Sequence, residues 1–413
     1  MTHPLAPFRP IGLIFAFAGF LAPIIPVIKN LGLAPLGVVC ALAGLWVIMR
    51  GGAKKVELDR SLWGVIAMVL LWQAASALWS LDPIASLEQT ARFGANMAIG
   101  FVLLYLAKAA TQSEISFAGK ALWVGFLAAV GFVGLDILLG GPISSVVYNR
   151  PDIGPAGYFW YNSAGSVFSV LAWPVALVAL RQGMPMLGGA ALALAVLSNY
   201  LIDSKSALLA ALVGIGTAGV TWLARGWGPK VIGAFVAIAV LASPVLPLTV
   251  LQPLNFGIMG GTRTHALLHR LYIWEFAAHH ALEKPALGWG MDASRRMPGG
   301  RETIVDPRYG IIGHAMPLHP HNTSLQVWLE LGLPGALLTA ALAFLIFRRI
   351  GQGTEDRTTR ALWTGQAVAT ITLAHLSFGA WQSWWISLIW ISIAFSMMVG
   401  RAKPTSETNP EPA

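Results

Sequence analysis

Long apolar runs separated by short polar stretches occupy most of this 413-residue sequence. The hydrocarbon core of a bilayer is about 30 Å thick, so a helix of about 20 apolar residues crosses it. A membrane β-barrel would instead show short strands of alternating polarity. The pattern therefore predicts an all-α polytopic membrane protein with about twelve transmembrane helices. The predicted spans are residues 10–28, 31–49, 62–79, 93–110, 121–140, 161–180, 185–202, 207–224, 231–251, 324–347, 361–379 and 382–400.

One large polar segment, residues 252–323, separates the ninth predicted span from the tenth. Within it, residues 263–284 have helical periodicity, with apolar side chains at i, i+4 and i+7 spacing. Residues 297–313 are rich in Gly, Pro and Arg and lack periodicity, which is typical of a mobile lid. The chain therefore divides into transmembrane helices 1–9 (residues 1–251), a large loop with short helices (252–323), transmembrane helices 10–12 (324–400) and a disordered tail (401–413).

The composition agrees with a membrane protein, since 56% of the residues are hydrophobic and only 11% are charged. Soluble domains carry about 25% charged residues. The net charge of +9 does not indicate nucleic acid, because the basic residues lie at the ends of apolar runs. We therefore expect no nucleic-acid partner. The single cysteine, Cys40, excludes an intrachain disulfide.

The distribution of Lys and Arg predicts the orientation in the membrane. One side carries 16 of the 27 basic residues, and the other carries 11, of which seven lie in the large loop. Short loops decide the orientation, and those on the second side hold only Lys29, Arg92, Arg150 and Lys205. Both termini are therefore predicted to be cytoplasmic, and the large loop to face outward, into the periplasm of a Gram-negative cell. On this outer side, residues 80–92 are predicted to form a short interfacial helix before the fourth span.

Seven of the nine histidines lie in the large loop, and it closes on His319-Pro320-His321-Asn322. A histidine at the mouth of a membrane cavity is suited to proton transfer, because its ordinary pKa is about 6.5. Two alternatives remain open from the residues alone. The run can serve as a polar cap for the tenth span, with Asn322 or Thr323 as the N-cap. It can also converge with His265 and His269 on a metal, although no cysteine and few acids accompany them.

Several basic residues on the same side are candidates for binding phosphate, which arginine grips through two parallel hydrogen bonds. They are Arg270, Arg263, Arg150 and Lys205. The alternative is that they pair with lipid head groups or with acids of the protein. The remaining loop arginines, Arg295, Arg296, Arg301 and Arg308, are predicted to form a solvated basic surface that could attract an anionic partner.

Two further features favour packing over chemistry. His375 lies in the middle of the eleventh predicted span, and we expect it to be a hydrogen-bonded packing residue. The run Trp381-Gln382-Ser383-Trp384-Trp385 is typical of an aromatic belt at the membrane surface.

Four elements of the sequence resemble motifs of the O-antigen ligase/polymerase superfamily of bacterial membrane glycosyltransferases. They cover roughly residues 145–335. The first lies in residues 148–162 and contains Asn-Arg-Pro, Gly-Tyr-Phe and Asn162, and the second is Asp203-Ser204-Lys205-Ser206. The third is Arg270-x3-Trp274 followed by Pro285-x2-Gly288-x-Gly290, and the fourth is His321-Asn322-x2-Leu325-Gln326 followed by Glu330-x-Gly332. Lys205 departs from the family pattern, since an arginine is usual there. The ligase is the most similar member, because its large loop also lies between the ninth and tenth of twelve spans.

The resemblance implies a glycosyltransferase that moves O-antigen from undecaprenyl diphosphate to a sugar hydroxyl of lipid A–core. Arg270, Lys205, Arg150 and Arg263 would bind the diphosphate, and His321, assisted by His319, would take the acceptor proton. Asn162, Asn322, Gln326 and Glu330 would support the site. The implied reaction is a direct displacement with inversion, and it needs neither a metal nor another cofactor. The enzyme would lie in the bacterial inner membrane, with membrane lipids around it.

Two other functions compete with this interpretation. A polymerase of the same superfamily would use the same lipid-linked donor but extend the glycan. A transporter of lipid-linked glycans belongs to another class, and it would be expected to show internal repeats and mid-membrane ion sites. The sequence shows no such repeat, and its polar groups gather on the outer face.

Overall fold

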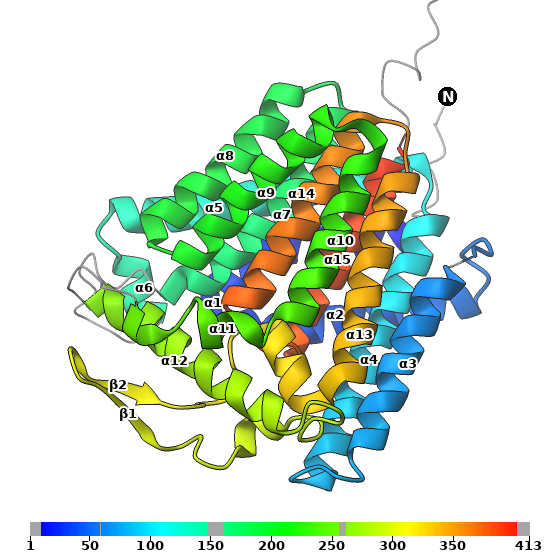
Figure 1. Ribbon diagram of the computed structural model, residues 1–413. Helices are drawn as coiled ribbons and strands as arrows, with labels where there is room; N and C mark the ends of the chain where they lie inside the picture. The colour runs from blue at the N-terminus through cyan, green and yellow to red at the C-terminus, as the bar shows by residue number, and fades with distance from the viewer. Residues whose placement is uncertain (1–9, 58, 148–159, 256–261, 403–413) are drawn as a thin grey trace, which may run out of the picture.

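The computed structural model describes residues 10–57, 59–147, 160–255 and 262–402, and helices dominate it (Figure 1). The helices are α1 Pro10–Ile28, α2 Leu33–Met49, α3 Arg60–Ser76, α4 Pro83–Ala109, α5 Gln112–Leu138, α6 Pro142–Val147, α7 Asn162–Arg181, α8 Pro185–Ile202, α9 Lys205–Leu223, α10 Gly228–Ala242, α11 Val245–Thr249, α12 Thr262–Glu283, α13 Thr323–Gln352, α14 Arg357–Leu376 and α15 Ser383–Gly400. Two short strands, β1 Thr303–Asp306 and β2 Gly310–His314, form an antiparallel pair.

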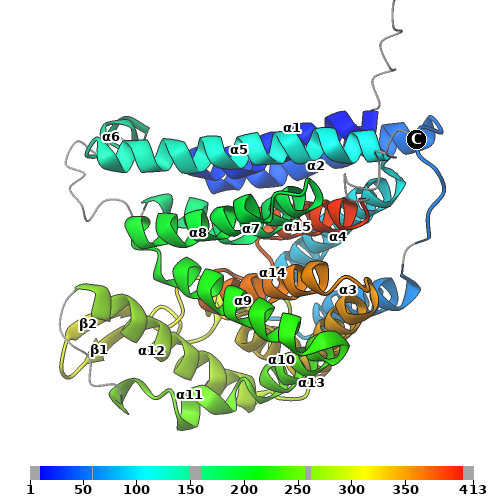
Figure 2. The ribbon, with the colours of Figure 1, turned by 90° about the horizontal axis from the view of Figure 1, so that it is seen from above.

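The long helices lie in layers, which are clearest from above (Figure 2). Helices α1, α2 and α5 form one outer layer, α7, α8, α15 and α4 lie beneath it, and α9 with α14 and α10 with α13 follow. Helix α7 is the most deeply buried of the long apolar helices, and Trp173 and Phe168 on it are fully enclosed. The large loop, with α12 and the β1–β2 hairpin, covers one end of this bundle, which we call the loop end (Figure 1).

The predicted fold class is confirmed. Among the described residues, nine helices are long and apolar enough to cross a membrane. The count of twelve spans stays a prediction. Helix α4 begins earlier than expected, because Asp82 accepts a hydrogen bond from the Ala85 N–H (3.0 Å) and caps it. The predicted interfacial helix is therefore the first part of α4.

The ninth predicted span, residues 231–251, is not one helix. Helix α10 ends at Ala242 and α11 begins at Val245. Pro244 lies at this break and has no N–H to continue the hydrogen-bond ladder. At 1.5 Å per residue, the 15 residues of α10 extend only about 22 Å. The apolar run therefore predicted a helix that continues further toward the C-terminus than α10 does.

The segment predicted as an aperiodic lid, residues 297–313, contains the β hairpin instead. The hairpin is attached to α12 at two points. The Tyr272 hydroxyl donates to Asp306 Oδ2 (2.8 Å), and His269 Nε2 donates to the carbonyl oxygen of His314 (2.8 Å). Arg308 pairs with Asp306 at 2.9 Å near the turn. The large loop is thus a folded cover on the bundle.

Glu330, on α13, attaches this cover to the helices. Its carboxylate is fully buried and accepts five hydrogen bonds. The donors are the N–H groups of Asp292 and Ser294, the Ser294 hydroxyl, the Gln326 amide and the Trp381 indole. A buried carboxylate is tolerated only when it is well hydrogen-bonded. Glu330 therefore fixes the loop around Asp292 to α13 and to the start of α15.

A kink in α13 lets the loop backbone join the helix backbone. Gly332 has φ 62° and ψ −159°, a conformation that is nearly restricted to glycine. The kink exposes the carbonyl groups of Leu329 and Glu330, which accept hydrogen bonds from the N–H groups of Trp289 and Gly290 (both 2.8 Å). A Cβ atom on Gly332 would lie 2.7 Å from the backbone nitrogen of Gly288. Only glycine fits this crossing.

We expect Gly332→Ala to lower the free energy of unfolding by at least about 1–3 kcal/mol, because it adds backbone strain and a clash with the loop. Thermal unfolding of the purified protein in detergent measures this change. Gly216→Ala is the matched control, since its Cβ would meet nothing within 4 Å. Equal melting temperatures for Gly332→Ala and Gly216→Ala would contradict the role assigned to the kink.

Candidate functional site

Helix α12 connects two parts of the loop end that are far apart in sequence. Arg270 and Trp274 are one turn apart on it. The Trp274 indole N–H donates to the carbonyl oxygen of Pro320, at 2.9 Å and in a buried position. Arg270 Nη1 donates to the hydroxyl of Ser206 at the start of α9 (3.4 Å). One helix therefore holds the His319–His321 turn and also reaches the α8–α9 junction.

A cavity of about 260 Å³, which we call the Arg270 cavity, lies where these elements meet. Side chains from the start of α7, the α8–α9 turn, α12 and the end of α14 line it. They are Asn162, Ser163, Ser166, Asp203, Ser204, Lys205, Ser206, Ala266, Arg270, Ser377 and Phe378. The cavity thus brings together three predicted site residues, Asn162, Lys205 and Arg270.

The electrostatics of the Arg270 cavity favour an anion. Burial lowers the pKa of the Arg270 guanidinium, and no carboxylate of the described residues lies within 4.0 Å of it. Helices α7 and α9 both begin at the cavity, and neither has a side-chain hydrogen bond at its N-cap. Free N–H groups and the helix dipole favour negative charge at such ends. Asp203 contributes one opposing charge, so the cavity holds two cations and one acid.

His321 contacts Ser377, which is one of the residues that line the Arg270 cavity. Its Nδ1 is 2.7 Å from the carbonyl oxygen of Ser377. A carbonyl can only accept, so Nδ1 carries the proton and Nε2 of the neutral ring presents a lone pair. Burial, Arg270 and His269 lower the pKa of His321, and the hydrogen bond to Ser377 raises it. The net shift is downward, which keeps the ring neutral at pH 7.

His319 has the opposite tautomer. Its Nδ1 accepts a hydrogen bond from the backbone N–H of His321 (3.2 Å), so Nε2 must carry the ring proton. The Gln382 amide nitrogen lies 3.1 Å from Nε2, while the Gln382 amide oxygen is buried without a partner among the described residues. Rotating this amide by 180° exchanges the two atoms, so that the oxygen accepts the Nε2 proton. The pKa of His319 is lowered to about 3. Burial is the main cause, and the nearby His321 and Arg295 contribute. His319 is thus a fixed neutral donor that cannot accept a further proton at Nδ1.

The two rings are close, with centroids 4.3 Å apart. His321 adopts a left-handed backbone conformation, φ 54°, which is uncommon outside glycine. The backbone N–H of His321 donates to His319, and its ring donates to the carbonyl of Ser377. The carbonyl of the preceding residue, Pro320, accepts from the indole of Trp274. The strained turn is therefore fixed on three sides, and His321 Nε2 is the atom suited to accept a proton.

Other predicted residues have structural positions. Asn322 caps α13, since its side chain accepts from the Leu325 N–H (3.2 Å), and the predicted N-cap is confirmed. Gln326 donates to Glu330 and accepts from the Ala380 N–H, so both Gln326 and Glu330 support the loop and do not line the cavity. Arg150 lies outside the described residues, as do the side chains of Arg263 and His265.

Two packing predictions had different outcomes. His375 is hydrogen-bonded at both nitrogens, to Ser324 (2.6 Å) and to the carbonyl oxygen of Ile371 (2.8 Å), as expected of a packing residue. The predicted aromatic belt is wrong. Trp381, Trp384 and Trp385 are all buried, and Trp381 donates to Glu330 at 2.6 Å.

Sequence reasoning also missed Gln382 and Ser377, which orient the two histidines. The signal for Gln382 was present, because it is a polar residue between tryptophans at the start of a span. Ser377 acts through its backbone carbonyl, which no sequence pattern reveals.

Comparisons with known proteins identify a family model and several proteins that this chain resembles. A family model described as O-Antigen ligase matches residues 190–340, which include Lys205, Arg270, His319 and His321. The chain is 25% identical to a protein of Rickettsia conorii named "Putative polysaccharide ligase", over 84% of this chain and 83% of that protein. Proteins of the same name from Rickettsia typhi and Rickettsia prowazekii are 25% and 26% identical, over 80% and 79% of this chain and 79% and 78% of their own lengths. The resemblance predicted from the motifs is thereby confirmed.

The assigned tautomers can be measured by nitrogen NMR of histidine-labelled protein in nanodiscs. We expect His319 to remain neutral, with its proton on Nε2, down to about pH 5, because its pKa is lowered to about 3. A His319→Gln spectrum identifies the signal by subtraction. A His319 ring that gains a second proton near pH 6.5 would contradict the assignment.

Proposed function

We propose that this chain, whose residues 190–340 match the O-Antigen ligase family model, is an O-antigen ligase-type glycosyltransferase. Its donor would be O-antigen on undecaprenyl diphosphate, and its acceptor a sugar hydroxyl of lipid A–core. The observation that carries this proposal is the joining of the Arg270 cavity to the His319–His321 turn through Ser377 and Trp274. A cationic cavity and a proton acceptor side by side suit transfer from a diphosphate to a hydroxyl.

The Arg270 cavity would hold the diphosphate of the donor. A half-buried guanidinium with no acidic partner among the described residues favours a ligand that supplies the countercharge. Arginine binds two phosphate oxygens at once, and Lys205 adds a point charge at the start of α9. Both cations would stabilise the negative charge that grows on the diphosphate as it leaves. Arg150 and Arg263 stay predicted contributors.

His321 would act as the general base. The acceptor hydroxyl oxygen attacks the anomeric carbon of the glycan, and its proton passes to His321 Nε2. The bond between that carbon and the diphosphate oxygen breaks, and undecaprenyl diphosphate leaves with the electron pair. One direct displacement of this kind inverts the anomeric configuration. His319 would position His321 and would not act as the base, because its Nδ1 lone pair already accepts the His321 N–H.

The proposed orientation puts the loop end in the periplasm and both termini in the cytoplasm, in the bacterial inner membrane. Helix α13 begins beside His321 and carries Arg348 and Arg349 near its far end. There Arg349 pairs with Asp59, at the N-cap of α3 and next to Arg60. This accumulation of cations opposite the loop end suits a cytoplasmic face.

The most informative test is the lipopolysaccharide profile of a strain that lacks the gene. The proposal predicts that all attached O-antigen disappears while long lipid-linked polymer accumulates. A core that still carries a single repeat would instead identify a polymerase. An unchanged profile would contradict both activities.

The proposed roles predict which side chains are needed. We expect His321→Ala to lower the transfer rate by about 10²–10⁴-fold, as for loss of a general base. Arg270→Ala should cost about 10²–10³-fold, and Arg270→Lys less, because lysine keeps the charge without the two-point geometry. His279→Ala is the matched control, since His279 is exposed on α12 and does not line the cavity. Transfer from lipid-linked donor by purified protein, at equal protein level, measures these rates. Wild-type rates for His321→Ala would remove it from the mechanism.

The pH profile should report His321. Its pKa is lowered below the ordinary 6.5, mainly by burial, so the base is already free at pH 7. We expect the transfer rate to be constant between about pH 7 and 8 and to fall on acidification below about 6.5, as the ring is protonated. Initial rates across this range test the expectation. A rate that rises on acidification would contradict a histidine base.

A further inference from the structure

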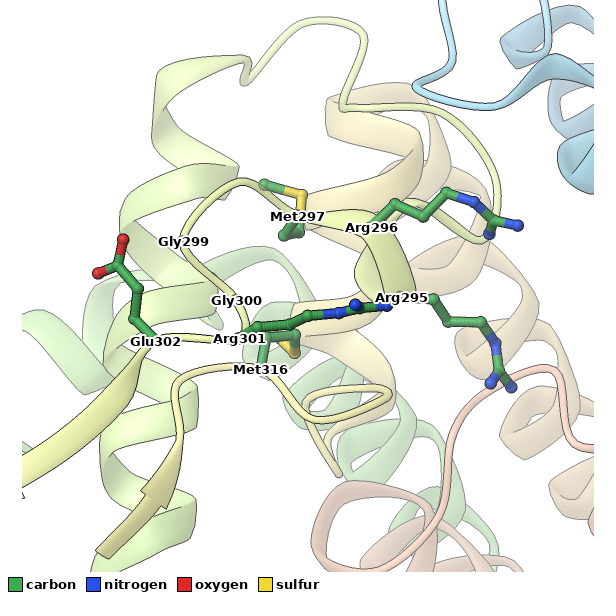
Figure 3. Close-up of a pocket in the computed structure, with 8 residues that line it drawn as sticks. All are labelled: Arg295, Arg296, Met297, Gly299, Gly300, Arg301, Glu302 and Met316. Atoms are coloured by element: carbon green, nitrogen blue, oxygen red, sulfur yellow. The ribbon is translucent and has the colours of Figure 1, made fainter. Parts of the chain in front are cut away.

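A second cavity, which we call the Arg301 cavity, lies in the loop end and has a volume of about 550 Å³. It shares no lining residue with the Arg270 cavity. Its lining residues are Arg295, Arg296, Met297, Gly299, Gly300, Arg301, Glu302 and Met316 (Figure 3). The proposed reaction assigns it no role.

The walls of the Arg301 cavity are held by backbone hydrogen bonds. The Gly300 N–H donates to the carbonyl oxygen of Met297 (3.0 Å), and the Met316 N–H donates to the carbonyl oxygen of Gly300 (2.7 Å). Met297 and Met316 are buried and pack in the same apolar cluster as Trp274. The cavity is therefore attached to the core that also supports the His319–His321 turn.

Three cations face the cavity in defined positions. Arg295 Nε pairs with Asp292 (3.0 Å), and Arg296 Nε pairs with Asp82 (2.9 Å). Arg296 Nη1 also lies 3.6 Å from Asp292. Acidic partners thus hold both side chains, and about 40% of each remains exposed. Arg301 makes no ion pair among the described residues. Figure 3 shows the three arginines extending to one side of the cavity, while the carboxylate of Glu302 points the other way.

One arginine of each cavity lies near a different member of the histidine pair. Arg295 is close enough to lower the pKa of His319, and Arg270 lowers that of His321. Met316 also lies only three residues before His319 in the chain. Each cavity therefore has an arginine near one of two rings whose centroids lie 4.3 Å apart.

We propose that the Arg301 cavity binds a phosphate group of the acceptor glycolipid and so places its hydroxyl at His321. The inference rests on the proposed function, which assigns the donor diphosphate to the Arg270 cavity and leaves these arginines for the second substrate. A phosphate monoester carries −1.5 to −2 charges and three acceptor oxygens, which suit the guanidinium groups of Arg295, Arg296 and Arg301. Asp292 and Asp82 compensate much of the charge of Arg295 and Arg296, whereas Arg301 has no ion pair among the described residues and is the cation left for a phosphate.

Equilibrium binding without donor tests the inference. The protein is placed in nanodiscs of neutral phosphatidylcholine and titrated with lipid A–core, either intact or enzymatically dephosphorylated. We expect Arg301→Ala to weaken binding of the intact glycolipid by about 10-fold or more, as for loss of a charge-assisted hydrogen-bond pair. It should not change binding of the dephosphorylated form. Lys284→Ala removes an exposed loop cation that does not line the cavity, and it should bind as wild type.

The remaining outcomes separate the alternatives. Equal loss of affinity for intact and dephosphorylated glycolipid would overturn the inference, as would equal binding by wild type and Arg301→Ala. Phosphatidylglycerol nanodiscs that abolish the Arg301-dependent binding would assign the cavity to membrane phospholipid instead.

A transfer assay distinguishes this inference from the proposed function. If both hold, Arg301→Ala raises the KM for acceptor about 10-fold and leaves kcat unchanged at saturating acceptor. Normal transfer with an unchanged KM refutes the acceptor site alone. Absence of transfer by the wild-type protein refutes the proposed function, whatever the binding result.

Discussion

The site depends on one hydrogen bond, from the Trp274 indole to the carbonyl oxygen of Pro320. Both groups are buried, so loss of the donor would leave a carbonyl without a partner, at a cost of about 1–3 kcal/mol. Because Arg270 is one turn from Trp274 on α12, the same contact sets the distance between the cationic cavity and the histidines. The spacing of arginine and tryptophan on one helix is therefore a geometric requirement of the site.

Glu330 provides the complementary constraint from the helical bundle. Its five hydrogen bonds connect α13, the start of α15 and the loop around Asp292. The kink at Gly332 allows the loop backbone to bond directly to α13. Trp274 and Glu330 thus attach the folded cover at two separate points, and Trp274 also holds the His319–His321 turn. A rigid cover of this kind positions groups for chemistry better than a mobile lid would.

The sequence predicted the fold class, the boundaries of most long helices and the helix that carries Arg270, because hydrophobic periodicity is a local signal. It also selected Asn162, Lys205 and Arg270, which the structure brings to one cavity. It could not predict that Gln382 orients His319 or that Ser377 orients His321, because those contacts join residues more than fifty positions apart. The break at Pro244 and the β hairpin were missed because apolar length and loop composition do not determine backbone breaks or strand pairing.

The central claim is that the Arg270 cavity and His321 form one active site. A structure of the protein with a non-hydrolysable undecaprenyl-diphosphate glycan tests it most directly. The account predicts diphosphate oxygens in contact with Arg270 and Lys205, with the anomeric carbon of the sugar facing His321 Nε2. A diphosphate bound among Arg295, Arg296 and Arg301 would contradict the account, because it would exchange the roles of the two cationic cavities.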